Sequence, residues 1–287
     1  MTKVTVLCLT YNHAPYIEAA LQGFVNQITD FDYIALIGDD ASTDGTSEIV
    51  RRYATEYPSR IIPIIRPRNI GGIANSRDLW SRVTTEYVIT CEGDDYWLDK
   101  LLLQKGVDFL DDHPECPMFC SNSLVHDLVS GETHPFVRAN SDGWFSLAAG
   151  HVIFPHISTR LMRYQRRRPI MDVFQFFYFA SLGPCYFQNE MVSTYNLTGH
   201  GYWSSLSEKE QRRYNLAALA TLNKFFNYRY DRHFTKAILA GRWWGKQLIT
   251  LKEIMTPQKF WTLYRLAAGC SKDIELMWTD DPKGNQN

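Results

Sequence analysis

Short hydrophobic runs alternate with amphipathic segments along the first 115 residues of the chain. The runs are rich in β-branched residues without strict polar alternation, which is typical of strands buried on both faces of a sheet. The segments between them repeat apolar residues at helical spacing, beginning with a stripe from Ile17 to Ile28. The predicted strands cover residues 4–10, 33–38, 61–65 and 87–91. One predicted helix begins near Pro15 and a second begins after residue 46, and two more cover residues 73–83 and 99–112.

Strands that alternate with helices at this spacing indicate βαβ units and a parallel sheet. Beyond residue 116 the pattern loosens, and shorter segments at 117–122, 151–159 and 185–195 predict strands that extend the same sheet, with a helix at 170–181. The predicted fold class is therefore α/β, a Rossmann-like, mostly parallel mixed sheet flanked by helices.

Helical periodicity returns near the C-terminus, over residues 208–227, 232–249 and 257–268, and predicts a C-terminal helical extension. The sequence contains no repeat and no low-complexity linker that would mark another boundary. The predicted domains are residues 1–206, with halves at 1–115 and 116–206, a helical extension at 207–280 and a disordered tail at 281–287.

Composition excludes several classes of function. The net charge of −1 gives no electrostatic case for nucleic-acid binding. Six cysteines form no CxxC pair and have no histidine at zinc spacing, which favours a reducing, cytoplasmic compartment. The N-terminal apolar run is too short for a signal peptide, and the longest apolar stretch, residues 173–187, is too short to span a bilayer.

Acidic residues cluster directly after two of the predicted strands. Asp39 and Asp40 follow the second strand, and ligands of such sheets bind beyond the carboxyl ends of the strands. Glu92, Asp94 and Asp95 follow the fourth strand. Carboxylates this close repel one another unless a cation lies between them, and their hard oxygens suit Mg²⁺ or Mn²⁺. A solvated turn or a helix cap explains either cluster alone, but two such clusters at neighbouring strand ends favour a shared metal and diphosphate site.

Three segments together resemble family 2 glycosyltransferases of the GT-A fold: "VTVLCLTYNHAPYIEAAL", "DDASTDGT" and "EYVITCEGDDYWLDKLLLQ". The likeness extends more weakly over residues 170–205, which resemble the acceptor side of that family. No glycine-rich turn follows the first strand, which argues against a dinucleotide-binding domain and against sugar nucleotidyltransferases. The resemblance implies that residues 1–115 bind a nucleotide sugar and that residues 116–206 face the acceptor.

The resemblance also implies roles for individual residues. Thr10, Tyr11 and Asn12 would face the nucleoside, and Asp40 would read a uracil or thymine base. Asp94 and Asp95 would correspond to the DxD motif of the family. Asp95 is the better candidate for direct contact with Mn²⁺ or Mg²⁺, and Asp94 is a candidate for the nucleotide sugar or the metal.

A second group of candidates lies elsewhere in the chain. Asp172 occupies the place of the catalytic base, although an acid before an apolar segment is also an ordinary helix cap. Relatives usually carry Arg after the Tyr of "VSTYNLTGHGYW" and His shortly beyond, where this chain has Asn196 and Thr198. His200 is a candidate for the metal or diphosphate and Arg77 for the phosphates, although a plain loop histidine and a solvated helix face explain them as well.

The function implied is that of an inverting, metal-dependent glycosyltransferase. It would move a sugar from a nucleoside diphosphate sugar, UDP-linked first and dTDP-linked next, to a glycan hydroxyl in bacterial surface polysaccharide, lipopolysaccharide or capsule assembly. The departures at Asn196 and Thr198 leave open a catalytically silent nucleotide-sugar-binding subunit or scaffold of a glycosyltransferase complex.

Two basic stretches of the sequence are candidates for contacts with binding partners. Residues 160–169 hold five arginines, which predict a solvated loop or a contact with a phosphate-rich acceptor such as a polyprenyl-diphosphate-linked glycan. Residues 208–270 combine basic and aromatic side chains, which suit a peripheral membrane surface on the inner face of the cell membrane, a homo-oligomer interface or plain packing helices.

Overall fold

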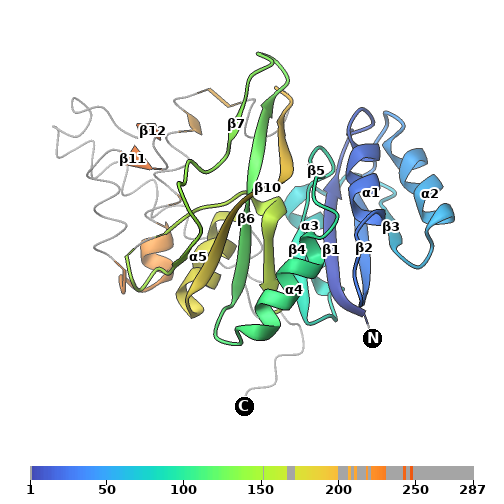
Figure 1. The fold of residues 1–287 in the computed structure, drawn as a ribbon. Coiled ribbons are helices and arrows are strands. Elements are labelled where there is room, and N and C mark those ends of the chain that lie inside the picture. The colour runs from blue at the N-terminus through green and yellow to red at the C-terminus, as the bar shows by residue number, and fades with distance from the viewer. Residues whose placement is uncertain are drawn as a thin grey trace. The chain divides into compact units, whose positions relative to one another are not determined.

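The computed structural model describes residues 2–150, 152–166 and 172–199, together with 206–207, 210–211, 218, 221–230, 242–243 and 246–247. The chain divides into two compact units. The first contains Met1–Ser146, Val152–Arg166 and Phe179–Thr198, and the second contains Leu147–His151, Arg167–Tyr178 and Gly199–Asn287. The large sheet belongs to the first unit (Figure 1).

Strands and helices alternate through the first part of the chain, as the hydrophobic pattern predicts. The order is β1 (Thr2–Thr10), α1 (Ile17–Val25), β2 (Asp32–Asp39), α2 (Thr46–Glu56), β3 (Ile61–Ile65), α3 (Gly72–Ser81), β4 (Tyr87–Thr90), β5 (Tyr96–Trp97) and α4 (Leu102–Asp112). The later elements are β6 (Met118–Asp127), β7 (Thr133–Pro135), β8 (Gly143–Phe145), the 3₁₀-helix η1 (Ile157–Thr159), β9 (Arg160–Arg163), α5 (Asp172–Leu182), β10 (Cys185–Leu197), β11 (Arg242–Trp243) and β12 (Lys246–Gln247).

The main sheet has the strand order β3-β2-β1-β4-β9-β6-β10-β5, with β7 beside β6 and β8 beside β10. The strands β3, β2, β1 and β4 run parallel, and β6 and β10 form a second parallel pair. β9 lies antiparallel between β4 and β6 and joins the two parallel groups. The α/β class with a mostly parallel mixed sheet is therefore confirmed.

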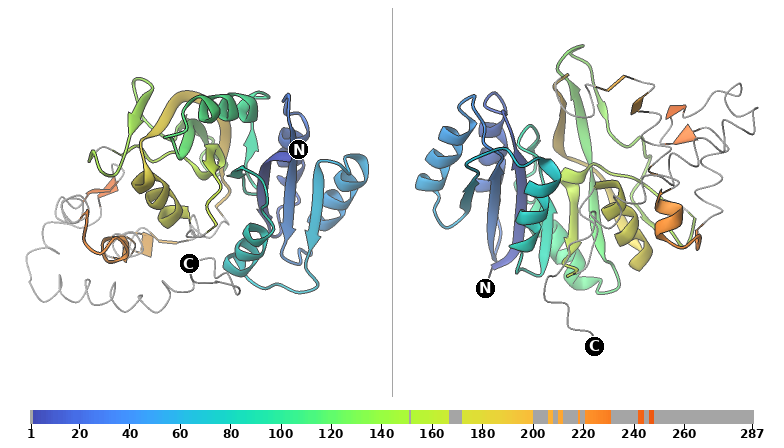
Figure 2. Two further views of the ribbon diagram at one scale, coloured as in Figure 1. Left: turned by 90° about the horizontal axis from the view of Figure 1, so that it is seen from below. Right: turned by 180° about the vertical axis from the view of Figure 1, so that it is seen from behind.

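Helices cover both faces of this sheet (Figure 2). Apolar side chains of α1, α2 and α4 form one hydrophobic core with the alternate residues Val4, Val6 and Cys8 of β1. The helix α3 packs on β1 and β2 from the opposite face, where a Cβ at Gly38 would lie 2.7 Å from Oδ1 of Asn75. Burial of a large apolar side chain stabilises the folded state by about 1.5–3 kcal/mol. The core on both faces of the sheet therefore holds the ends of the strands in fixed positions.

Three expectations from the sequence are wrong. The helix α1 ends at Val25, and Ile28 lies beyond it with 59% of its surface exposed. Residues 152–155 form no strand, since η1 begins at Ile157 and the strand starts only at Arg160. The predicted helix over 232–249 is broken by the antiparallel pair β11 and β12. The predicted helix at 257–268 and the tail at 281–287 lie outside the described residues.

The arginine-rich stretch 160–169 is also only in part a solvated loop. Its first four residues form β9 inside the sheet, and Arg160 is fully buried. The Nε of Arg160 donates to the carbonyl oxygen of Pro155 over 2.9 Å, and its guanidinium lies 4.3 Å from the ring centre of Phe154. Residues 167–169 lie outside the described part. Among the described residues, no helix has both the length and the apolar character needed to span a bilayer.

Candidate active site

The strands β1, β2 and β4 end at one edge of the sheet, because Thr10 pairs with Asp39 and Leu7 pairs with Thr90 in parallel register. Backbone hydrogen bonds continue past the strand ends. The N–H of Asp40 donates to the carbonyl oxygen of Thr10 over 3.0 Å, and the N–H of Gly93 donates to that of Leu9 over 2.8 Å. The two acidic stretches therefore flank the end of β1, as the sequence predicts.

The loop after β1 is locked onto the loop after β2. Asn12 has a φ of 55°, a left-handed conformation that Asn adopts more readily than most residues. Its N–H donates to Oγ of Ser42 over 2.8 Å, and its Oδ1 accepts from the N–H of Thr43 over 2.9 Å. Thr10 is buried, whereas 45% of Tyr11 is exposed. The loop thus holds the Tyr11 side chain at the surface beside the acidic strand ends.

Asp39 and Asp40 have different partners. Asp39 is fully buried and accepts from the hydroxyl groups of Ser42 and Ser47, so it holds its own loop against the start of α2. The two carboxylate oxygens of Asp40 accept from the N–H groups of Ile70 and Gly71, each over 2.8 Å. Asp40 therefore fixes the turn that leads into α3.

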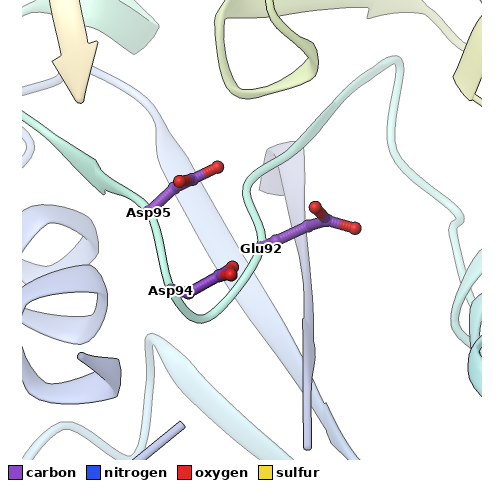
Figure 3. A group of neighbouring side chains, drawn as sticks. All are labelled: Glu92, Asp94 and Asp95. Atoms are coloured by element: carbon purple, nitrogen blue, oxygen red, sulfur yellow. The ribbon is translucent and has the colours of Figure 1, made fainter. Parts of the chain in front are cut away.

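Glu92, Asp94 and Asp95 project from one turn after β4 (Figure 3), and each offers a carboxylate oxygen within 4.8 Å of the others. Glu92 is exposed, Asp94 is half-buried and Asp95 is 1% exposed. Burial above all, and then the charges of Asp94 and Glu92, raise the pKa of Asp95 well above its usual range. The cluster concentrates negative charge at the end of the sheet.

The carboxylate of Asp95 is only half satisfied. Its Oδ1 accepts from the N–H of Asn196 over 3.0 Å, while its Oδ2 is buried without a hydrogen-bond partner among the described residues. A buried polar atom without a partner costs free energy, which a bound cation would offset. Three carboxylates are the hard oxygen donors that Mn²⁺ and Mg²⁺ prefer. The donor set thus fits a divalent cation.

Gly93 allows the acidic turn to lie against β1. A Cβ at this position would be 2.7 Å from Oγ1 of Thr10 and 2.9 Å from Cδ1 of Ile17. Contacts below 3.0 Å force neighbouring atoms to move, so the turn needs glycine between its acids. The packing explains why a residue without a side chain interrupts the acidic cluster.

Three further residues contact the acids. Nε2 of His13 lies 3.9 Å from Oδ2 of Asp94, and Nε2 of His156 lies 3.7 Å from Oδ2 of Asp95. Burial, and then the charge of Arg160, lower the pKa of His156 to about 3, so its imidazole is neutral. Asn196 holds the turn through its backbone and side chain. Sequence reasoning missed both histidines, because no spacing or motif connects them with the acids.

Three predicted site residues belong to other segments of the chain. Arg77 is half-buried on α3. Asp172 is the first residue of α5 and belongs to the second unit. His200 lies outside the described residues. Their roles stay predictions.

Two solved structures share the fold. One is Staphylococcus aureus TarS 1–349 in complex with UDP-GlcNAc, at a TM-score of 0.55 and 16% identity over 96% of this chain and 82% of that chain. The other is the mannosyltransferase PcManGT from Pyrobaculum calidifontis in complex with GDP-Man and Mn²⁺, at a TM-score of 0.52 and 19% identity over 99% of this chain and 76% of that chain. At these identities the likeness establishes the fold alone.

Sequence comparison adds a relative and a family. An uncharacterised protein of Mycobacterium tuberculosis is 47% identical over 112 residues, which cover 39% of this chain and 32% of that protein, so the match spans a third or less of that relative's length. Residues 5–175 match the family model described as glycosyl transferase family 2. Because this match covers more than half of the 287 residues, the chain belongs to glycosyl transferase family 2.

Proposed function

We propose that the protein is an inverting glycosyltransferase that moves a sugar from a nucleoside diphosphate sugar to a glycan hydroxyl. The observation that carries this proposal is the convergence of Glu92, Asp94 and Asp95 on one turn beside the end of β1, with a buried carboxylate oxygen of Asp95 left without a partner among the described residues. Family membership supports the reaction class.

The donor we propose is a UDP-linked sugar, with a dTDP-linked sugar as the second choice. Each oxygen of Asp40 accepts one backbone hydrogen bond, and a carboxylate oxygen has a second lone pair that can accept the imide N–H of uracil or thymine. Thr10 at the end of β1, with Tyr11 and Asn12 in the loop after it, lies next to Asp40 in the structure. TarS was solved with UDP-GlcNAc, which supports this choice, whereas PcManGT was solved with GDP-Man, so the base needs a direct test.

Asp94 and Asp95, with Glu92 beside them, are the residues that would hold Mn²⁺ or Mg²⁺. A divalent cation bound there would stabilise the negative charge that develops on the leaving diphosphate. The complex of PcManGT with Mn²⁺ supports a metal in a neighbour of this fold. Arg77 on α3 is the proposed cationic side chain for the phosphates, and His200 stays a secondary candidate.

Asp172 is the proposed base. Its carboxylate takes the proton of the acceptor hydroxyl while the acceptor oxygen forms a bond to the anomeric carbon. The bond from that carbon to the diphosphate oxygen breaks, and the nucleoside diphosphate leaves as an anion. A single displacement of this kind inverts the anomeric configuration and needs no covalent sugar intermediate.

Thermal unfolding with UDP, dTDP, GDP and CMP, each with and without Mn²⁺, tests the donor site. A ligand at 100 times its dissociation constant stabilises the native state by about 2.7 kcal/mol. We expect UDP with Mn²⁺ to raise the melting temperature most and EDTA to reverse the gain. No response to any of the four nucleotides would contradict the proposal.

Asp172→Asn separates an enzyme from a silent binding subunit. Loss of a general base lowers turnover about 10²–10⁴-fold, so the variant should lose sugar transfer and keep its stabilisation by UDP with Mn²⁺. A chain that binds the nucleotide but shows no turnover before or after the substitution is instead a binding subunit.

The acceptor we propose is a glycan of bacterial surface polysaccharide assembly. Assays of sugar transfer to lipid-linked and to free glycans would test this proposal.

A further inference from the structure

His156 is held in one orientation by its own turn. The residue precedes η1 and is 7% exposed. Its Nδ1 accepts from the backbone N–H of Ser158 at 3.4 Å and lies 2.8 Å from Oγ of the same serine. Because the backbone N–H can only donate, Nδ1 carries no proton, and the imidazole proton therefore resides on Nε2.

A buried hydroxyl chain supports this arrangement from behind. Oγ of Ser158 lies 2.9 Å from Oγ of Ser193, which lies 2.8 Å from Oγ of Ser123. These serines are fully buried on β10, β6 and η1. The ring of Tyr195 stacks on His156 with its centre 4.2 Å away. A flip of the ring would move Nδ1 away from Ser158, and a change of the ring plane would break the stacking, so Nε2 has a fixed direction.

Nε2 of His156 faces the unsatisfied side of Asp95. Nε2 lies 3.7 Å from Oδ2 of Asp95, which is longer than a normal hydrogen bond. Oδ1 on the other side is already bound by the N–H of Asn196. The two oxygens of Asp95 thus face two different donors, and His156 lies beside the oxygen that lacks a hydrogen-bond partner among the described residues.

We propose that His156 is a positioning residue, whose Nε2–H orients the carboxylate of Asp95 toward a cation held with Asp94 and Glu92. This inference rests on the proposed function and deepens its metal site. Groups that hold a metal ligand in place from behind usually account for about 10–100-fold in metal affinity or activity. His156 contributes in this way without itself contacting the substrate.

Two amide substitutions separate the functions of the two ring nitrogens. In His156→Asn the amide can replace Nδ1 as the acceptor for Ser158, but nothing replaces the Nε2 donor. In His156→Gln the longer side chain places an N–H₂ group near the position of Nε2. Ser158→Ala keeps the imidazole and removes the hydroxyl that fixes it. His113→Asn is the matched control, since Nδ1 of His113 contacts the carbonyl oxygen of Phe109, remote from the acids.

The readouts are Mn²⁺ affinity in the presence of saturating UDP, measured by isothermal titration, and the melting temperature without ligand. We expect His156→Asn to weaken Mn²⁺ binding about 10-fold or more, His156→Gln to restore most of it, Ser158→Ala to fall between, and His113→Asn to match the wild type. If His156→Asn is too unstable to titrate, Ser158→Ala and His156→Gln still decide whether His156 positions Asp95 or has only a structural role.

The outcomes distinguish this inference from the function on which it rests. Wild-type protein that binds no Mn²⁺ would overturn the metal site and this inference together. Wild-type protein that binds Mn²⁺ while His156→Asn, or Ser158→Ala in its place, binds equally well would overturn the role of His156 alone. Equal losses of affinity in His156→Asn and His156→Gln would show that the residue has only a structural role, and would likewise overturn the inference.

Discussion

Asn196 clamps the turn that carries Asp95. Its backbone N–H donates to Oδ1 of Asp95 over 3.0 Å, and its Nδ2 donates to the carbonyl oxygen of Asp94 over 2.6 Å. The contact is made possible by β5, whose Trp97 pairs antiparallel with Ser193 of β10. Asn196, one of the two residues that depart from the family pattern in this region, is therefore part of the acidic site's support.

Replacement of Asn196 by Ala should loosen this turn. The backbone bond to Asp95 remains, but the side-chain bond to Asp94 is lost, which costs about 1 kcal/mol in unfolding free energy. We also expect a smaller stabilisation by UDP with Mn²⁺, because both carboxylates become more mobile. Urea unfolding and thermal shifts measure the two effects. The exposed Asn140→Ala is the control, and equal behaviour of the two variants would contradict the clamp.

The arrangement of the fold follows from sequence to a considerable extent, because buried parallel strands and amphipathic helices leave strong periodic signals. The strand β9 left no such signal, since the arginines in its sequence are typical of a loop. Arg160 is buried because the carbonyl oxygen of Pro155 and the ring of Phe154 compensate for its charge. Such local compensation leaves no periodic trace. The two-residue β5 is likewise too short to show any alternation.

The acidic half of the site was predictable for a similar reason. Parallel strands place their carboxyl ends at one edge, so Asp40, Asp94 and Asp95 had to lie around the end of β1. His156 was not predictable, because it reaches Asp95 only through the turn at η1 and its contact with Ser158. Tertiary packing sets that contact, and the sequence near His156 resembles an ordinary apolar strand.

Gly93→Ala should destabilise the protein. The added Cβ would approach Thr10 and Ile17 to less than 3.0 Å, and overpacking of this kind costs about 1–3 kcal/mol. Gly72→Ala is the matched control, because no atom lies within 4 Å of its added Cβ at the start of α3, and a gain of about 0.5 kcal/mol is expected there. Denaturant unfolding measures both changes. A stable Gly93→Ala protein would show that the turn does not need this close approach.

Asp44 should make stability depend on pH. Burial tends to raise its pKa, but hydrogen bonds from Thr46 and from the N–H of Ala14 outweigh burial and lower it. A carboxyl with a lowered pKa stabilises the fold above its unfolded pKa of about 3.9 and loses that contribution as pH falls through the folded value. Asp44→Asn should therefore cost about 0.5–1 kcal/mol at pH 7, a modest value for an exposed group. The gap should narrow below pH 4 in urea unfolding, whereas a gap that stays constant with pH would contradict the assignment.

Asp40→Asn tests whether this carboxylate reads the base or only holds the turn before α3. Asn offers one oxygen to the N–H groups of Ile70 and Gly71, so one of them loses its acceptor and stability should fall by about 1–3 kcal/mol in either case. Base reading adds a second effect. The uracil imide N–H donates to a carboxylate, whereas N3 of cytosine can accept only from a donor such as the Asn amide. We therefore expect the ratio of UDP to CDP affinity, measured with Mn²⁺ at a temperature where both proteins are folded, to fall about 10-fold or more, which corresponds to about 1.4 kcal/mol. An unchanged ratio with reduced stability would limit Asp40 to the structural role that its backbone contacts already describe.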